Sequence, residues 1–376
     1  MLAAGTAAQT SFSAVTIGLP VLAPVLRDAY DLSLFRVGIV LDSVWVGTML
    51  TLLPWGLLAD RIGERLVLAV GLGACAAALI GAANTDTFTQ LVVLLALAGA
   101  AGASVNSASG RAVMQWFPAS ERGLALGVRQ TAIPLGGLVA AIALPALGLH
   151  SAFIFLAALC FGGAAFGWAV IREREAAVDV LEPHGLRTTL RDARLWWLCG
   201  GSSLYVAAQI AVTGFVVLFL HDERGFSPGE AAAVLGGIQV LATVLRIATG
   251  RWSDVIGSRL VPLRIVGLVS SVTLALAAAV IDAPSALLVP AFVLAGGFSM
   301  SWNGLSFTAA AELAGRGRSG AAIGMQQTAL SAAGALVPPA FAALVAATSW
   351  RVGFALAAVF PLVGVQLLRP LRSVRA

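Results

Sequence analysis

Apolar residues occur along this chain in twelve long runs that are separated by short polar segments. The first six runs cover residues 5–26, 37–59, 65–84, 90–114, 122–147 and 151–171, and the last six cover residues 195–220, 229–250, 260–281, 285–309, 319–346 and 350–369. About 20 apolar residues in a helix cross a hydrocarbon core of ~30 Å. Because lipid cannot satisfy backbone polar groups, each run is predicted to be an α-helix that spans a membrane.

The long polar segment between the sixth and seventh runs divides the chain. It covers residues 172–194 and contains the turn-forming sequence Glu182-Pro183-His184-Gly185. We therefore expect an N-terminal six-helix bundle in residues 1–171, a cytoplasmic linker in 172–194 and a C-terminal six-helix bundle in 195–376.

The composition agrees with a membrane protein. Of the 376 residues, 59 % are hydrophobic and only 11 % are charged, whereas about 25 % are charged in a soluble domain. The cysteines and histidines are scattered, and their spacing indicates no disulfide, metal or cofactor site. We find no arrangement of nucleophile and base, so we do not expect an enzyme.

The basic residues predict the orientation. All 23 are arginine and the net charge is +5. If both termini are cytoplasmic, 16 arginines lie on that side, 4 lie on the other side and 3 lie within spans. Positive residues are enriched in cytoplasmic loops, so we expect a multi-pass protein of the cell inner membrane with cytoplasmic termini. Because the arginines lie between apolar spans, they do not indicate nucleic-acid binding.

Internal repeats relate the two halves. Three segments recur in the second half: 56–67 as 250–261, 98–106 as 295–303, and 127–132 as 324–329. The first pair is separated by 194 residues and the other two by 197. Three matches at nearly one offset indicate that the halves are homologous and have the same orientation in the membrane.

The first of these segments resembles a known signature loop. Gly56, Leu58, Asp60, Arg61, Gly63 and Arg65 match the G-x-L-a-D-r-x-G-r-[KR] loop of the major facilitator superfamily, and Glu64 departs from it. The resemblance implies an all-α fold of twelve helices in two homologous bundles. It also implies a secondary transporter whose bundles alternate access to a central site.

The repeated loops are candidates for a cytoplasmic gate. Asp60 is expected near the positive end of the helix dipole at the start of run 319–346, and Asp254 near Arg122 in the other half. The gate residues predicted from the two loops are Gly56, Asp60, Arg61, Gly63, Arg65, Asp254 and Arg259. The alternative is that the loops are basic segments that only fix the topology.

Three arginines within the spans are candidate substrate ligands, because buried charges in membranes usually have a function. Arg246 resembles the arginine that binds the substrate carboxylate in monocarboxylate and oxalate/formate porters, although Ala242 replaces the aspartate of the former. Arg129 corresponds to Gln326 in the repeat. Arg111 resembles a superfamily arginine that can either support the helices or contact substrate.

Further polar residues in the spans complete the predicted site. Asp42 is the one acidic candidate for proton coupling, and its alternative is an interfacial carboxylate paired with Arg36. The neutral candidates for substrate binding are Asn106, Gln130, Tyr205, Gln209, Gln239, Asn303, Gln326 and Gln327, with Trp45 and Trp302 as cavity walls. Hydrogen bonding between helices is their alternative role.

The excess of arginine over acid in the spans favours an anionic substrate. We therefore predict that a monomer transports a small organic anion, most simply a carboxylate, either together with protons or in exchange. A drug/proton antiporter is disfavoured because Ile133-Pro134-Leu135-Gly136-Gly137 lacks the spacing of the antiporter motif. We also consider a neutral-metabolite porter and, more remotely, a membrane sensor that does not transport.

Overall fold

Every regular element that the structure describes is helical. The computed structural model describes residues 2–106, 129–171, 188–315 and 318–371. The first half contains α1 (Leu2–Ala29), α2 (Leu34–Ile62), α3 (Glu64–Ala83), α4 (Phe88–Gly102), α7 (Ala132–Ala143), the short 3-10 helix η1 (Leu144–Ala146) and α8 (Leu149–Val170). The second half contains α10 (Ala193–Asp222), α11 (Pro228–Ile256), α12 (Leu260–Ala279), α13 (Ser285–Ser299), α14 (Asn303–Ala314), α15 (Ser319–Ala347), α16 (Trp350–Leu367) and η2 (Arg369–Leu371).

The described residues contain eleven helical segments that are long and apolar enough to cross a membrane. A shorter apolar segment, Ala132–Ala146, belongs to the predicted run 122–147, part of which lies outside the described residues. The predicted all-α membrane fold is therefore confirmed. The run 285–309 differs from the prediction, because it is divided into α13 and α14.

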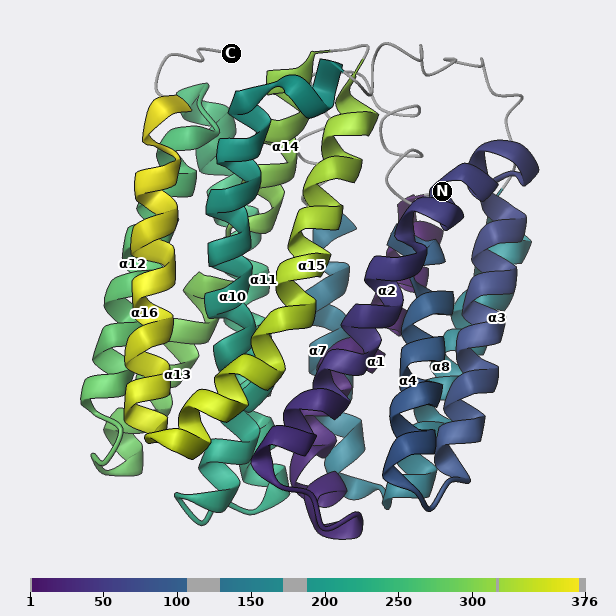
Figure 1. Cartoon of the computed structure of the whole chain (residues 1–376), viewed down its shortest axis with the longest axis vertical. Coiled ribbons are helices and arrows are strands. Elements are labelled where there is room, and N and C mark those ends of the chain that lie inside the picture. The colour runs from purple at the N-terminus through teal and green to yellow at the C-terminus, as the bar shows by residue number, and fades with distance from the viewer. Residues whose placement is uncertain (1, 107–128, 172–187, 316–317, 372–376) are drawn as a thin grey trace.

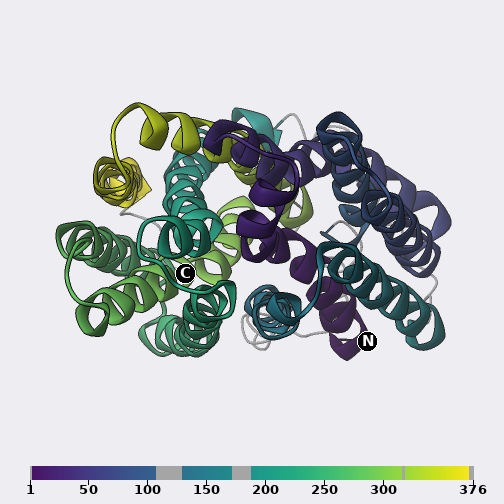
Figure 2. The ribbon, with the colours of Figure 1, turned by 90° about the horizontal axis from the view of Figure 1, so that it is seen from below.

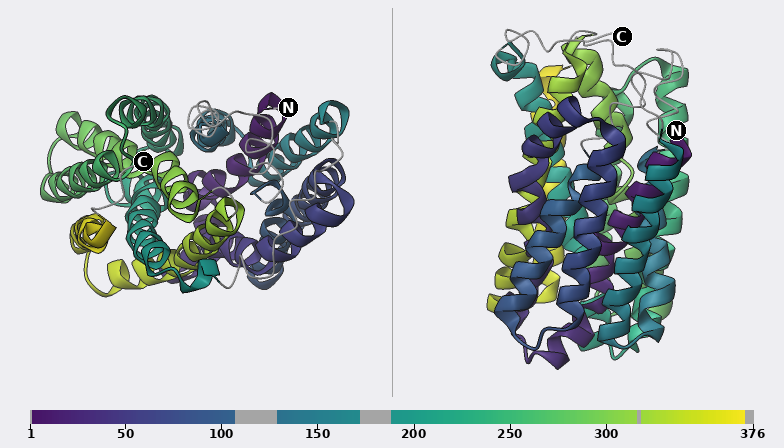
Figure 3. Two further views of the ribbon diagram at one scale, coloured as in Figure 1. Left: turned by 90° about the horizontal axis from the view of Figure 1, so that it is seen from above. Right: turned by 90° about the vertical axis from the view of Figure 1, so that its right-hand side faces the viewer.

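The helices form two bundles that lie side by side. Helices α1 to α8 form one bundle and α10 to α16 the other, as the views along the helices show (Figures 2 and 3). Both described chain ends lie in the upper part of Figure 1, and we call this the terminal side. The bundles contact each other mainly through α2 with α15, α7 with α11, and α1 with α10.

Local sequence signals fix several helix ends. The Ser33 and Thr87 hydroxyls accept hydrogen bonds from backbone N–H groups at the starts of α2 and α4, which satisfies donors that a helix leaves free. The two signature loops turn at Gly63, with a φ of 88°, and at Gly257, with a φ of 62°. Glycine is favoured at both positions, because positive φ values are unfavourable for residues with a Cβ.

Small residues allow close packing within the N-terminal bundle. A Cβ placed on Gly99 of α4 would lie 2.1 Å from the carbonyl oxygen of Val44 on α2. A Cβ on Gly47 of α2 would lie 1.9 Å from the carbonyl oxygen of Ala96. Neither position has room for a side chain, so the two backbones touch, as expected for glycines at helix interfaces in membranes.

Candidate functional site

The structure interrupts one membrane span in each bundle at equivalent positions. In the N-terminal bundle α4 ends at Gly102 and the chain turns at Ala103. In the C-terminal bundle α13 ends at Ser299 and α14 begins after a turn that starts at Met300. Ala103 and Met300 are 197 residues apart, which is the offset of the repeat. Each interruption leaves carbonyl groups without their helical partners.

Neighbouring helices donate hydrogen bonds near these interruptions, but with different chemistry in the two bundles. In the N-terminal bundle the Thr51 hydroxyl and the Trp55 indole of α2 each donate to the Ala100 carbonyl, both at 2.7 Å. In the C-terminal bundle the Nε of Arg246 on α11 donates to the Met300 carbonyl at 2.8 Å. The second interruption thus has a charged donor in addition to the Thr249 hydroxyl, which donates to the Ser301 carbonyl at 3.4 Å.

The rest of the Arg246 guanidinium connects the two bundles. Nη2 donates to Oδ1 of Asn303 at 3.2 Å, and Nη1 donates to the carbonyl of Gln130 in the N-terminal bundle at 2.5 Å. Gln130 has a free carbonyl because its helical partner would be the N–H of residue 134, which is a proline. The sequence thus contained the signal for this acceptor, although the pairing with Arg246 was not predicted.

The hydrogen-bond acceptors of Arg246 are all neutral. The side chain is 4 % exposed, and its three acceptors are two backbone carbonyls and one amide oxygen. None of the ion pairs found among the described residues involves Arg246. Three of its five N–H groups are used, so Nη1 and Nη2 each keep one further donor. The charge and these donors suit an anionic ligand.

Two other groups of predicted residues lie inside the C-terminal bundle. The Trp302 indole donates to Oε1 of Gln209 at 3.2 Å, and its ring packs edge-on against Tyr205. The Tyr205 hydroxyl in turn donates to the Leu263 carbonyl at 3.2 Å. These bonds connect helices of one bundle. Trp302 directly precedes Asn303, so Trp302 and its partner Gln209 connect to the Arg246 site.

Gln326 is fully buried in a cluster of hydroxyl groups. Its amide nitrogen donates to Ser202 and Ser306, which lie on α10 and α14 of the same bundle. Its repeat mate Arg129 is also buried and has an interaction of its own. The hydrogen bonds to these hydroxyl groups give Gln326 a structural role within the C-terminal bundle.

Three other predicted ligands form no hydrogen bond with Arg246 among the described residues. Asn106 and Gln327 are half-buried. Arg111 lies outside the described residues. The structure therefore brings together Arg246, Gln130 and Asn303 directly, with Trp302 and Gln209 beside them.

Two predicted residues lie at interfaces between the bundles. Trp45 on α2 packs on Gly334 of α15, where a Cβ on the glycine would lie 2.6 Å from the indole ring. Gln239 on α11 packs on Gly137 of α7 in the same way. Both contacts join opposite bundles.

Asp42 lies on the face of α2 that packs against α15. Gly38 and Trp45, which lie one turn before and after it, contact Pro338 and Gly334 of α15. The Oδ1 of Asp42 is buried and has no hydrogen-bond partner among the described residues. The side chain of Arg36 instead lies over the Phe88 ring, with 5.4 Å between the guanidinium carbon and the ring centroid.

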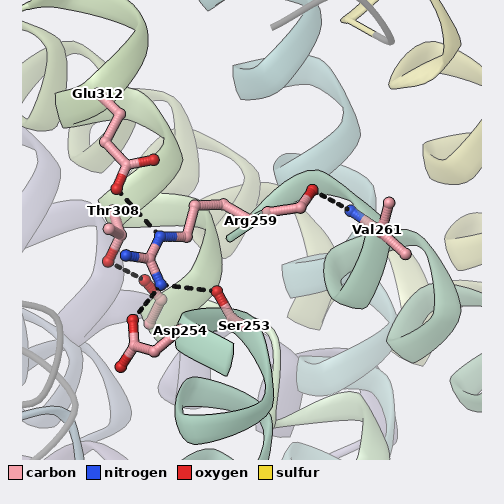
Figure 4. Close-up of polar contacts among 8 residues, drawn as sticks. Ser253, Asp254, Arg259, Val261, Thr308 and Glu312 are labelled. Carbon is pink, nitrogen blue, oxygen red and sulfur yellow. Dashed lines mark hydrogen bonds and ion pairs between the residues drawn. The ribbon is translucent and has the colours of Figure 1, made fainter. Parts of the chain in front are cut away.

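The second signature loop forms an ionic cluster on the terminal side (Figure 4). Arg259 bonds Asp254 and Ser253 at the end of α11, and its Nε donates to Oε1 of Glu312 on α14 at 3.0 Å. Burial alone would lower the pKa of Arg259, but the hydrogen bonds to Asp254 and Glu312 outweigh it and raise that pKa. The cluster joins helices of one bundle. The predicted partner of Asp254, Arg122, lies outside the described residues.

The first signature loop is described in part. The side chains of Asp60 and Arg61 lie outside the described residues. Arg65 donates to the Trp168 carbonyl of α8 at 2.6 Å and lies over the Trp168 ring. The cytoplasmic gate therefore stays a prediction.

An ion pair that the sequence did not predict joins the bundles on the side opposite the termini. Arg27 at the end of α1 bonds Asp222 at the end of α10. His221 also contacts Asp222, at 2.9 Å. Neither residue belongs to the predicted site, and the fold brings them together where α1 and α10 end.

The two-bundle arrangement is shared with solved transporter structures. A bacterial homolog of the human lysosomal transporter Spinster, in an inward-facing and occupied conformation, aligns with a TM-score of 0.81 at 14 % identity and covers 98 % of this chain and 95 % of that one. The transporter FucP, a fucose:proton symporter of E. coli, aligns in its outward conformation with a TM-score of 0.73 at 17 % identity, covering 99 % of both chains. These likenesses show the fold.

Sequence comparison adds the family. The Major Facilitator Superfamily pattern matches residues 4–338. The uncharacterized MFS-type transporter Rv2994 of Mycobacterium tuberculosis is 34 % identical over 356 residues, which is 93 % of this chain and 80 % of that protein. Two further relatives are 26 % identical to this chain. The alignment with SauU, a probable sulfoacetate transporter of Cupriavidus necator, covers 64 % of this chain and 59 % of SauU. The alignment with MdtG, a multidrug resistance protein of Yersinia enterocolitica, covers 68 % of this chain and 64 % of MdtG.

The fold and the family match define a multi-pass membrane transporter of the secondary class, with two homologous helical bundles. The chain belongs to the Major Facilitator Superfamily. It is therefore not an enzyme.

Proposed function

We propose that this transporter carries a small organic anion, most simply a carboxylate, which binds to Arg246 between the two bundles. The observation that carries the proposal is the buried guanidinium, whose acceptors are all neutral oxygens. A buried charge without a counterion is unfavourable in a membrane protein. A substrate carboxylate would supply the missing negative charge.

The position of Arg246 would make anion binding relevant to transport. Its bond to Gln130 crosses from one bundle to the other, whereas Met300 and Asn303 lie in its own bundle. A carboxylate that bonds the two Nη groups would use donors that arginine presents in a planar fork. We propose that the substrate oxygens replace or supplement the carbonyl of Gln130 and the amide oxygen of Asn303.

The relatives point to more than one substrate class. A probable sulfoacetate transporter supports an anionic substrate, because sulfoacetate is a small organic anion. A multidrug resistance protein matches a similar share of the chain and supports drug efflux as the second candidate. The buried guanidinium of Arg246 favours the anion, since it would repel a cationic drug.

Coupling, gating and location complete the proposal. We propose Asp42 as the site of a co-transported proton, because it lies at an inter-bundle interface and one of its carboxyl oxygens has no partner among the described residues. We retain the signature loops around Asp60 and Asp254 as the cytoplasmic gate, and the inner membrane with cytoplasmic termini as the location. In this orientation the terminal side is the cytoplasmic side.

Calorimetric titration of the purified protein tests the substrate class. The probes are pyruvate, glucuronate and sulfoacetate as anions, glucose as a neutral compound and ethidium as a cation. We expect at least one anion to bind, and Arg246→Gln to abolish that binding. Loss of one partner of a buried charged pair costs about 3–5 kcal/mol, which corresponds to more than about 100-fold in affinity.

Two further variants make the test specific. Arg246→Lys keeps the charge but loses the fork, so we expect weaker binding of the anion than in the wild type. Arg351→Lys makes the same change at an exposed arginine that is paired with Asp282 on one bundle, and should bind as the wild type does. Binding of glucose or ethidium alone, or unchanged anion binding in Arg246→Gln, would contradict the proposal.

A further inference from the structure

The two long interfaces between the bundles are related by the internal repeat. Trp45 and Gln239 are 194 residues apart, and Gly334 and Gly137 are 197 apart, which are the offsets of the repeated segments. A Cβ on Gly334 would lie 2.6 Å from the Trp45 ring, and a Cβ on Gly137 would lie 2.7 Å from Cδ of Gln239. At each interface a large side chain of one bundle therefore packs on a glycine of the other.

The two equivalent contacts differ in polarity. Trp45 presents its apolar ring to Gly334. Gln239 has no exposed surface, and neither its amide oxygen nor its amide nitrogen has a hydrogen-bond partner among the described residues. Burying an amide without partners is unfavourable, and an aliphatic side chain at this position would avoid that cost. The Gln239 amide has no role in the conformation seen here, so we infer that it acts in another conformation.

Gln239 lies on the same face of α11 as Arg246. Both residues are buried, and seven residues, or about two helical turns, separate them. The corresponding rise is about 10 Å. The guanidinium of Arg246 bonds the carbonyl of Gln130, and Gln239 packs on Gly137, seven residues further along the other bundle. An anion bound to Arg246 thus has Gln239 beyond its other end.

Separation of the bundles would expose the amide. Gln239 and Gly137 belong to different bundles, so movement of α7 away from α11 uncovers both polar atoms. The described ion pair of Arg27 with Asp222 lies at the side opposite the termini, and α2 packs on α15 in the part of the interface that contains Gly38 and Pro338. The conformation seen here is therefore closed on the opposite side.

We propose that Gln239 is a substrate-binding residue of the conformation that is open on the opposite side. There its amide bonds a neutral polar group, such as a hydroxyl or carbonyl, of the anion that Arg246 holds. When the interface closes, Gln239 returns to Gly137 and this contact is lost, which favours release on the terminal side. The inference rests on the proposed anion site, and it narrows the substrate to organic anions with a polar group remote from the carboxylate.

Matched pairs of ligands test the role of Gln239. The first pair is hexanoate and 6-hydroxyhexanoate, and the second is cyclohexanecarboxylate and glucuronate. Affinities are measured by calorimetry on the purified wild-type chain and on Gln239→Leu, Gln239→Asn and Arg246→Gln. In the wild type we expect the hydroxylated member of at least one pair to bind about 10-fold more tightly, which is about 1.4 kcal/mol.

Gln239→Leu should reduce this preference to less than about 2-fold while the unhydroxylated anion still binds. Gln239→Asn, which keeps the amide, should retain part of the preference. Ser270→Ala is the control, because Ser270 is also buried but its hydroxyl bonds the Val266 carbonyl within α12. It should keep the wild-type preference.

A second measurement tests whether the contact of Gln239 with the anion requires the opposite side to open. Cysteines introduced at Arg27 and Asp222, which touch in the closed conformation, are joined by a short thiol-reactive cross-linker to hold the opposite side closed. The cross-linked chain should lose the preference for the hydroxylated anion, and cleavage of the linker should restore it. A preference that persists in the cross-linked chain would overturn the inference.

The outcomes separate the two proposals. If no anion of either pair binds, the proposed function fails, and the inference fails with it. If anions bind and Arg246→Gln abolishes binding, but the wild type shows no preference or Gln239→Leu keeps it, only the inference is wrong.

Discussion

The guanidinium of Arg246 on α11 donates a hydrogen bond of 2.5 Å to the carbonyl of Gln130 in the other bundle. This carbonyl is available because Pro134 has no N–H to donate to it. A proline in one repeat and an arginine in the other are therefore joined through one backbone oxygen. The bond holds the bundles together at the level of the proposed substrate site.

Pro134→Ala should weaken this connection. Alanine restores the N–H that can close the helix onto the Gln130 carbonyl, in competition with Arg246. A hydrogen bond to a charged group contributes about 1.5–3 kcal/mol, so we expect a measurable shift toward the conformation open on the opposite side. The measurement is the labelling rate of a cysteine at Ala141, which faces Gly236 across the interface, by a membrane-impermeant thiol reagent.

The matched control for this variant is Pro361→Ala. Pro361 lies inside α16, within the C-terminal bundle, so its replacement should leave the labelling rate at position 141 unchanged. Equal rates in Pro134→Ala and the wild type would show that the bond to Gln130 does not hold the interface closed.

The glycines at the two interfaces make a second prediction. Gly334→Ala and Gly137→Ala each insert a methyl group where the neighbouring side chain leaves no room. Overpacking of this kind costs about 1–3 kcal/mol, here in the closed conformation only. Each variant should therefore open the opposite side.

Reporters on the other interface test whether the bundles move as rigid bodies. A cysteine at Ala141 reports on Gly334→Ala, and a cysteine at Ala342, which faces Gly38, reports on Gly137→Ala. We expect faster labelling in both cases. Gly73→Ala is the control, because a Cβ at Gly73 meets no atom within 4 Å. Faster labelling only at the mutated interface would contradict rigid-body motion.

The sequence was sufficient to predict the fold because hydrophobic length and repetition determine it. Apolar runs and two offsets gave the spans and the equivalence of the halves, which the structure shows for the described residues. The interruption between α13 and α14 was not predicted. An apolar run has the same composition whether its carbonyls bond within the helix or to a side chain such as Arg246.

The site was predicted only in part for a similar reason. Arg246, Gln130 and Asn303 are recognisable as polar residues in apolar runs, but the same signal selects Gln326 and Tyr205, which bond within one bundle. Depth along a helix can be read from the sequence. The direction of a side chain toward its own bundle or toward the other depends on packing between distant segments.

The ion pair of Arg27 with Asp222 makes a third prediction. The side chains are 38 % and 18 % exposed, and partly exposed pairs contribute about 0.2–1 kcal/mol. Asp222→Asn should thus increase the fraction of the protein that is open on the opposite side about 1.5- to 5-fold. The exchanged pair Arg27→Asp with Asp222→Arg should reverse most of this increase, and labelling at position 141 measures both. If high salt, which screens exposed charges, has no effect in the wild type, the pair contributes nothing to closure.

Arg259 makes a prediction about stability. It joins α11 to α14 through Asp254, Ser253 and Glu312, so Arg259→Gln should lower the free energy of unfolding by about 1 kcal/mol or more, since the cluster contains several bonds. The expected result is a lower melting temperature in a thermal unfolding assay. Arg351→Gln, which removes a single exposed pair with Asp282, should have a smaller effect. Equal effects would mean that the cluster adds nothing beyond a surface ion pair.

Asp42 makes the last prediction, which concerns proton coupling. Its carboxyl lies between Gly38 and Trp45 on the face of α2 that contacts α15, and its Oδ1 has no partner among the described residues. Opening of this interface would give the carboxyl access to protons from the opposite side. Asp42→Asn removes the titratable group while keeping nearly the same size and polarity.

Two assays in proteoliposomes separate coupling from transport. Asp42→Asn should abolish accumulation of a labelled anion driven by a pH gradient, because no proton can accompany the substrate. It should preserve exchange of labelled for unlabelled anion, which requires no net proton movement. Asp28→Asn makes the same change at an exposed aspartate near the end of α1 and should retain both activities. Gradient-driven accumulation that survives in Asp42→Asn would assign the proton to another group, and loss of exchange as well would mean that Asp42 supports the helices and not the coupling.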